Sequence, residues 1–382
     1  MGASLSGANA AATAPDLARP RIRRGALVLI AASAVLAVAI LAGIRYGLML
    51  AVGLGFGLAL EGLRFGFAGP WRAMILRRDP SGILAQLLSI GIVATVALPL
   101  IAARDGELVG AQAPVGWAMI GGAFVFGAAM QVVLGCGSGT LVNAGSGNPI
   151  GLLALPFFAL GSFAGAYHLI WWTELGALPV VNAVGWTGVT VTLGELAAVA
   201  GLLWRVAAPE HRSIRRAHVV AASAVAALAL ANLLVSGQPW GVVYGLGLWV
   251  AKGATAAGLD LSGSAFWSAP ESVERVRASL LVDYTSLTNI GIMLGAFLVA
   301  SWRVEGLSQR LPALPPRAWA ATVVAGLLLG YSSRLAFGCN VGAFFSGIST
   351  GSLHGWVWFA AAFAGAFLGV RLRPALGLEA RS

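Results

Sequence analysis

The feature that most constrains this chain is a series of long apolar runs separated by short polar segments. There are eleven such runs, and each is 17 to 24 residues long. A helix needs about 20 apolar residues to cross the hydrocarbon core of a bilayer. The runs cover residues 26–44, 46–62, 82–102, 114–135, 149–171, 186–206, 217–235, 239–258, 278–301, 318–335 and 353–370. We therefore predict an all-α polytopic membrane protein with about 9–11 transmembrane helices.

The composition excludes the other broad classes. Apolar residues make up 58% of the chain and charged residues 10%, whereas soluble domains carry about 25% charged residues. Disordered chains are poor in apolar residues, and two cysteines are too few for a disulfide scaffold. Transmembrane β-strands alternate between polar and apolar residues, and these runs are continuous.

The net charge is +10, and every cationic side chain except Lys252 is an arginine. The most basic segments are residues 1–24, 64–78 and 205–216. Because cytoplasmic loops are enriched in arginine and lysine, we place all three in the cytoplasm. If all eleven runs cross the membrane, Arg371 and Arg373 lie on the side opposite the cytoplasm. This conflict indicates that the number of crossings is off by one. The chain lacks the interleaved aromatic and basic residues of a nucleic-acid surface, so we expect no nucleic-acid partner.

The two cysteines occur in matching contexts, which indicates an internal repeat. A tryptophan precedes each of them at the start of an apolar run, and Gly127 and Gly330 each lie nine residues before the cysteine. Duplicated halves with a midplane substrate site are common in transporters. The predicted organisation is a disordered tail (1–24), an extra N-terminal transmembrane helix (25–45), a first repeat (46–206), a basic linker with a connecting helix (207–238), a second repeat (239–370) and a C-terminal tail (371–382).

The segments 136–148 and 339–351, each opened by a cysteine, are glycine-rich and uncharged. Such segments are either turns packed through small residues or irregular backbone inside the membrane, which is tolerated only where protein or a cavity surrounds it. We favour short segments buried between helices, whose N–H groups and hydroxyls would bind an anion. The predicted substrate-binding residues are Gly135, Cys136, Gly137, Ser138, Gly139, Thr140, Asn143, Arg334, Gly338, Cys339, Asn340, Gly342 and Ser346.

A protonated thiol can donate a weak hydrogen bond to a soft acceptor such as an anionic sulfur atom. A redox disulfide between the two cysteines is the competing interpretation. Among charged residues, Arg334 lies five positions before Cys339 and is best placed to meet an anion, with Arg64 a weaker candidate. Glu61 and Lys252 are interpreted either as residues at the ends of membrane helices or as part of the substrate path.

At the two cysteine segments the chain resembles the YeeE/YedE family of bacterial sulfur-compound transporters. The resemblance rests on Gly135–Gly139 and Phe337–Ile348, and it extends over about residues 46–370. It implies a pseudo-symmetric protein of the bacterial inner membrane that passes thiosulfate along cysteine thiols, and a cytoplasmic sulfurtransferase as a partner of some members. Cys136 and Cys339 would be the central thiols of this relay. Many members carry a further cysteine in the segment that here reads 64–69, where this chain has Gly66, so the exact substrate stays open.

These observations favour a permease for a small sulfur-containing anion, with thiosulfate as the first candidate, rather than an enzyme. The alternatives are a membrane redox or sulfurtransfer protein that uses the cysteines as a persulfide or disulfide, and an assembly subunit without transport. We find no nucleotide-binding motif, and we expect no cofactor, no metal site and no catalytic residue.

Overall fold

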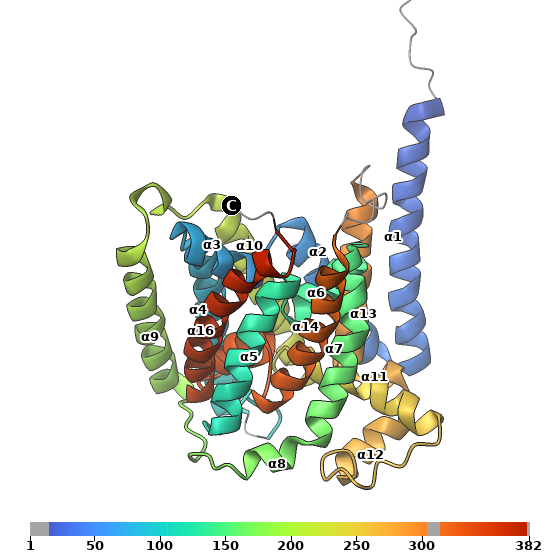
Figure 1. Ribbon diagram of the computed structural model, residues 1–382. Helices are drawn as coiled ribbons and strands as arrows, with labels where there is room; N and C mark the ends of the chain where they lie inside the picture. The colour runs from blue at the N-terminus through green and yellow to red at the C-terminus, as the bar shows by residue number, and fades with distance from the viewer. Residues whose placement is uncertain (1–14, 105, 304–313, 380–382) are drawn as a thin grey trace, which may run out of the picture.

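Ten long apolar helical stretches form the body of the protein. The computed structural model describes residues 15–104, 106–303 and 314–379, and every regular element in these ranges is a helix (Figure 1). Eight of the stretches are single helices: α1 (Pro15–Ala42), α2 (Ile44–Gly62), α4 (Ser81–Ala103), α7 (Pro149–Tyr167), α9 (Gly185–Val206), α10 (Arg216–Ser236), α13 (Tyr284–Trp302) and α16 (Leu353–Ala375). Each is long and apolar enough to cross a membrane. The prediction of an all-α polytopic membrane protein is confirmed.

The other two stretches are interrupted by a turn at a cysteine. The first consists of α5 (Trp117–Val133) and α6 (Gly137–Gly145). The second consists of α14 (Pro316–Leu335), a π-helix η3 (Asn340–Phe345) and α15 (Ser346–Ser349). The remaining short elements are α3 (Ala68–Arg77), α8 (Leu169–Thr173), η1 (Pro209–His211), α11 (Val243–Ala256), α12 (Pro270–Arg277) and η2 (Leu280–Val282).

The predicted run 239–258 is not a full membrane crossing. Only α11 is helical there, and its 14 residues give a length of about 21 Å, short of the roughly 30 Å hydrocarbon core. The chain leading to α11 contains Trp240 and Val242, which are buried in the protein. The described residues thus contain ten candidate crossings, one fewer than the eleven apolar runs, as the positions of Arg371 and Arg373 indicated. The extra run arose because a buried half-length helix is as apolar as a complete span.

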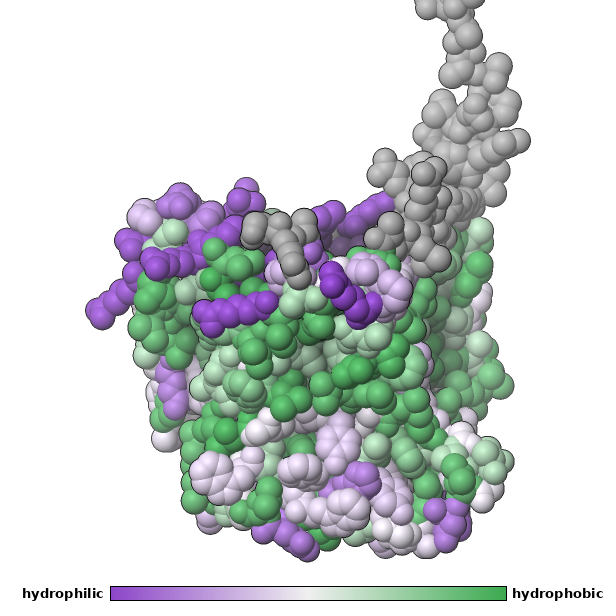
Figure 2. All heavy atoms as spheres, in the orientation of Figure 1, coloured by the Kyte–Doolittle hydropathy of each residue, from purple (hydrophilic) through white to green (hydrophobic). Residues whose placement is uncertain are grey.

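Ten crossings place both ends of the described chain at the same end of the bundle (Figure 1). Hydrophilic residues gather at this end above a broad apolar band, as Figure 2 shows. The two basic segments 64–78 and 205–216 meet there, since the Ala208 N–H donates to the Arg78 carbonyl oxygen at 3.1 Å. We call this the Arg-rich end. The predicted disordered tail differs from the structure in part, because Pro15–Arg24 belongs to α1, while residues 1–14 lie outside the described residues.

Glycines let the helix that precedes each cysteine turn pack closely against the helix that follows the other turn. Where α5 crosses α16, a Cβ added to Gly127 would lie 1.9 Å from the Ala362 carbonyl oxygen. Where α14 crosses α7, a Cβ added to Gly330 would lie 2.0 Å from the Phe158 carbonyl oxygen. Helices inside a bilayer lack a hydrophobic driving force for association, and small residues favour association by letting the helices pack closely. The two glycines matched in the sequence therefore have the same structural role.

The two interrupted stretches run in opposite directions after their cysteines. From Cys136, α6 leads toward Ser146, near the Arg-rich end. From Cys339, η3 and α15 lead toward Thr350, whose hydroxyl accepts from the Ala111 N–H at 2.9 Å in the loop at the opposite end (Figure 1). This arrangement agrees with two halves of inverted topology, although the repeat boundaries themselves stay a prediction.

We predict that Gly330→Ala destabilises the protein, because the added methyl group meets backbone atoms that cannot move aside. Overpacking of this kind costs about 1–3 kcal/mol, and we expect a fall of several degrees in the unfolding temperature in detergent. Gly194→Ala is the matched control, since an added Cβ on that α9 glycine meets nothing within 4 Å. Equal unfolding temperatures for the two variants would contradict the close crossing of α7 and α14.

Candidate functional site

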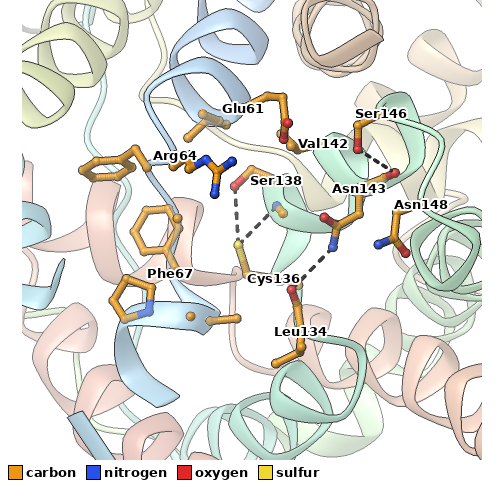
Figure 3. A pocket seen from close by; sticks show the side chains of 18 of the residues that line it. Glu61, Arg64, Phe67, Leu134, Cys136, Ser138, Val142, Asn143, Ser146 and Asn148 are labelled. Carbon is orange, nitrogen blue, oxygen red and sulfur yellow. Dashed lines mark hydrogen bonds between the residues drawn. The ribbon is translucent and has the colours of Figure 1, made fainter. Parts of the chain in front are cut away.

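A cavity of about 490 Å³ opens near the Arg-rich end and leads inward to Cys136 (Figure 3). Its wall is built from the end of α2, the loop that leads into α3, the first turn of α3, the α5–α6 turn and one side of α6. The residues of these elements that line it are Leu60, Glu61, Arg64, Phe65, Gly66, Phe67, Ala68, Gly69, Pro70, Leu134, Gly135, Cys136, Ser138, Gly139, Val142, Asn143 and Ser146, with Asn148 and Arg303 at its rim.

The turn between α5 and α6 presents the Cys136 thiol to the cavity. Leu134 ends α5 in the left-handed conformation, with a φ of 54°, and Cys136 forms the N-cap of α6. The Cys136 sulfur accepts the Gly139 N–H at 3.5 Å and lies 3.4 Å from the Ser138 hydroxyl. The first N–H groups of a helix have no partner within it, so they and the Ser138 hydroxyl surround the thiol with donors. Such an arrangement can bind an anion.

Cys339 occupies a turn with nearly the same backbone geometry. Phe337 has a φ of 56°, and the Cys339 carbonyl accepts from the Ala343 N–H at 2.8 Å. The Cys136 carbonyl accepts from the Thr140 N–H at the same distance. The matched motifs in the sequence therefore fold into matched turns. They continue differently, because a nine-residue α-helix follows Cys136 and a six-residue π-helix follows Cys339.

The two turns meet at Gly137. A Cβ added to this glycine would lie 2.8 Å from the Cys339 sulfur and 3.3 Å from a methyl group of Val242. No side chain larger than glycine fits without displacing the second thiol. Cys339 is fully buried and does not line the cavity, so it lies directly behind the first residue of α6.

Only part of the predicted site faces the cavity. Of the predicted residues, the cavity is lined by Gly135, Cys136, Ser138, Gly139 and Asn143. The Thr140 hydroxyl instead donates to the Cys136 carbonyl at 2.8 Å, and the Ser346 hydroxyl donates to the Trp240 carbonyl at 2.7 Å. These two side chains support the turns rather than the cavity wall. Those that lie outside the wall are Gly137, Thr140, Arg334, Gly338, Cys339, Asn340, Gly342 and Ser346.

Arg334, which we predicted to meet the anion, lies away from this cavity. Its guanidinium stacks on the ring of Phe266 at 4.6 Å and lies 5.8 Å from the ring of Tyr244. It therefore points toward α11 and the segment that follows it, which no spacing along α14 could indicate. Lys252, a candidate for the path, donates to backbone carbonyls at the end of α12, with 2.7 Å to the Arg275 oxygen.

Asn340, next to the second cysteine, has buried polar atoms that are not used by the fold. Its side chain is fully buried, and within the described part of the chain neither its amide nitrogen nor its amide oxygen has a hydrogen-bond partner. The indole nitrogen of Trp240 is buried in the same way. Nearly all buried polar groups in folded proteins are paired. The unpaired amide of Asn340, beside the second thiol, is thus available to a ligand.

Arginines surround the mouth of the cavity. Arg303 forms an ion pair with Glu61, with 2.9 Å between Nη1 and Oε1, while the Arg64 side chain points toward Ser138 and Cys136 (Figure 3). Arg64 forms no ion pair with any residue that the structure describes. The guanidinium groups of Arg64 and Arg303 and the carboxylate of Glu61 together give the mouth a net positive charge. The sequence analysis did not single out Arg303, because its position just after an apolar run is typical of a residue at the end of a membrane helix.

Gly66, where the resemblance described above implies a cysteine in other members, lies on the cavity wall. Its carbonyl accepts from the Gln86 amide at 2.8 Å, and an added Cβ would meet nothing within 4 Å. Both native cysteines are free thiols. No group of three or more metal-binding side chains occurs in the described ranges.

The chain is similar in sequence to one named thiosulfate transporter and to two probable transporters. The thiosulfate transporter TsuA of Spirochaeta thermophila is 25% identical over 335 residues, which cover 81% of this chain and 93% of that protein. The probable transporter YedE of Escherichia coli is 33% identical over 96 residues, and YedE of Salmonella typhimurium is 38% identical over 82 residues. These two matches cover 25% and 22% of this chain but only 23% and 20% of the YedE proteins.

A sequence model of a sulphur transport family matches residues 63–368, which include both cysteine turns and the helices that cross beside them. The match covers most of the chain, and the chain is therefore a member of this sulphur transport family of multi-pass membrane proteins.

Proposed function

We propose that this protein is a permease for a small sulfur-containing anion, with thiosulfate as the first candidate, and that the two cysteines relay it. The observation that carries the proposal is the succession of the two thiols. The cavity ends at Cys136, and only the first residue of α6 separates Cys136 from the Cys339 sulfur. An anion leaving one thiol would therefore reach the next by a short movement.

The donors around the two thiols suit thiosulfate in chemical type. Thiosulfate is a dianion with one soft sulfur and three hard oxygens, so it needs a thiol-type contact and several N–H or O–H donors. Cys136 and Cys339 offer the thiols. The N–H groups at the start of α6, the Ser138 hydroxyl and the Asn340 amide offer the other donors. Neutral donors bind more weakly than a ring of arginines would, which permits release.

The proposal also concerns the membrane in which the protein lies, its orientation there and its partner in the cytoplasm. The thiosulfate transporter TsuA aligns with this chain over most of both proteins. We place the protein in the bacterial inner membrane with its Arg-rich end in the cytoplasm, because cytoplasmic loops carry the excess of arginine. A cytoplasmic sulfurtransferase would then receive the anion at the mouth of the cavity.

We expect Cys136→Ala and, separately, Cys339→Ala to lower uptake of sulfur-labelled thiosulfate by at least about tenfold, since a hydrogen bond to a charged group contributes about 1.5–3 kcal/mol. Uptake is measured in cells without other thiosulfate importers, with the amount of protein in the membrane as the control. Wild-type uptake by both variants would refute the relay. Cysteine-to-serine variants keep a hydrogen-bond donor and should retain part of the uptake. Serine variants as inactive as the alanine variants would favour the persulfide or disulfide alternative.

Arg64→Gln should weaken binding of thiosulfate in the cavity about two- to fivefold, the effect of one exposed charge. The measured quantity is the thiosulfate concentration that halves alkylation of Cys136 in inside-out vesicles, in a Cys339→Ala chain. Arg77→Gln is the control, because Arg77 is an exposed arginine of α3 at the same end that does not line the cavity. The difference should shrink at high salt, where exposed charges are screened. Equal half-protecting concentrations in both variants would show that Arg64 does not act on the anion.

Gly66→Cys should increase uptake at low thiosulfate concentration, because it adds a thiol on the cavity wall where a Cβ meets no neighbour. Gly66→Ala adds the same carbon without the sulfur and should transport like the unmodified chain. Uptake is compared for the three chains at equal amounts of membrane protein. If Gly66→Cys and Gly66→Ala behave alike, a third thiol has no part in transport by this protein.

A further inference from the structure

A buried arginine near the end of α16 contacts the helix that precedes the first cysteine. The Arg373 side chain is only 5% exposed. A buried guanidinium is tolerated where ion pairs and hydrogen bonds compensate for its lost hydration. Its Nη1 donates to the carbonyl oxygens of Gln131 at 2.7 Å and Val132 at 2.6 Å, and its Nε donates to Glu379 at 2.5 Å. Gln131 and Val132 lie far from Arg373 in the sequence, whereas Glu379 lies in the C-terminal tail.

The two carbonyls belong to the last turn of α5, which ends at Val133. The final carbonyls of a helix have no donor within the helix, and a cation beside them is favourable. Cys136 follows this helix end by three residues, through Leu134 in the left-handed conformation. Arg373 therefore fixes the point at which the turn that carries Cys136 begins.

Glu379 extends this contact to a third element. Its Oε1 lies 2.6 Å from Arg72 of α3 as well as 2.5 Å from Arg373. Partial burial alone would raise the pKa of Glu379, but the hydrogen bonds from Arg373 and Arg72 hold this pKa below its ordinary value. At neutral pH the carboxylate is thus charged and shared by two guanidinium groups.

A further hydrogen bond connects this network to the cavity wall. The side-chain amide of Gln131 donates to the carbonyl oxygen of Ala68 at 3.1 Å, and Ala68 both begins α3 and lines the cavity. The end of α5, the start of α3 and the C-terminal tail are therefore joined around Arg373. Among the described residues, no arginine side chain bonds to the last carbonyls of α14, so the turn at Cys339 lacks an equivalent contact.

We propose that Arg373, Glu379 and Arg72 form a latch through which the C-terminal tail positions the Cys136 turn. Arg373 is a positioning residue in this scheme, because it acts on the thiol through the end of α5. The latch concerns the placement of the thiol and holds whatever anion the protein carries. Loss of the latch frees the end of α5 and exposes Cys136 more often, while the Cys339 turn keeps its own backbone contacts.

The test is the rate at which N-ethylmaleimide alkylates each cysteine in membranes, measured by mass shift. Cys136 is followed in a Cys339→Ala chain, and Cys339 in a Cys136→Ala chain. Arg373→Met keeps an unbranched side chain but loses the charge and the donors, and it should raise the Cys136 rate about tenfold. The Cys339 rate should stay unchanged. Arg371→Met is the matched control, because Arg371 is exposed on the same last turns of α16.

Two milder variants keep the test decisive if Arg373→Met does not reach the membrane. Glu379→Gln removes only the shared charge, and Glu379→Ala removes the side-chain acceptor altogether. Both should raise the Cys136 rate alone. An unchanged Cys136 rate, or an equal rise at both cysteines, would overturn the proposal. No sulfur anion is used, so failure here is distinct from failure of the transport proposal.

Discussion

The structure depends on how the chain satisfies its backbone where two long membrane stretches are interrupted. Free N–H and C=O groups are costly inside a bilayer and are tolerated only where protein or a cavity surrounds them. Both cysteine turns meet this condition. Gly127 and Gly330 bring the helix before each turn into backbone contact with the helix after the other turn, and both cysteines are buried. The opened helix ends then provide donors for an anion where a continuous helix would provide none.

Charge is separated from these donors. The cysteine segments are uncharged, while arginines lie at the mouth of the cavity and beneath the α5 helix end. Arg64 can favour the presence of an anion in the mouth of the cavity, and neutral groups around Cys136 can bind it without holding it too tightly. Arg373 is bound to backbone carbonyls and to Glu379. It therefore stabilises the end of α5 and does not offer a competing site for the anion. This division suits a protein that must both bind and release its cargo.

Much of the fold and part of the site could be predicted from the sequence. The apolar runs indicated the membrane helices, and the matched cysteine motifs indicated the matched turns. Hydropathy could not show that α11 is half-length, because a buried helix and a spanning helix are equally apolar. The contact between Gly137 and Cys339 joins residues about two hundred positions apart, and only tertiary packing creates it. Arg373 was assigned to a tail because an apolar run ends before it, and the orientation of Arg334 depends on aromatic rings far along the chain.

In the proposed mechanism this chain alone carries a sulfur-containing anion past two thiols. The decisive measurement is uptake of labelled thiosulfate into liposomes that contain only the purified protein. We expect uptake above that of protein-free liposomes, saturation with thiosulfate, and loss of uptake when Cys136 and Cys339 are both replaced by alanine. Uptake equal to that of empty liposomes from folded protein, or uptake unaffected by removing both thiols, would contradict this mechanism.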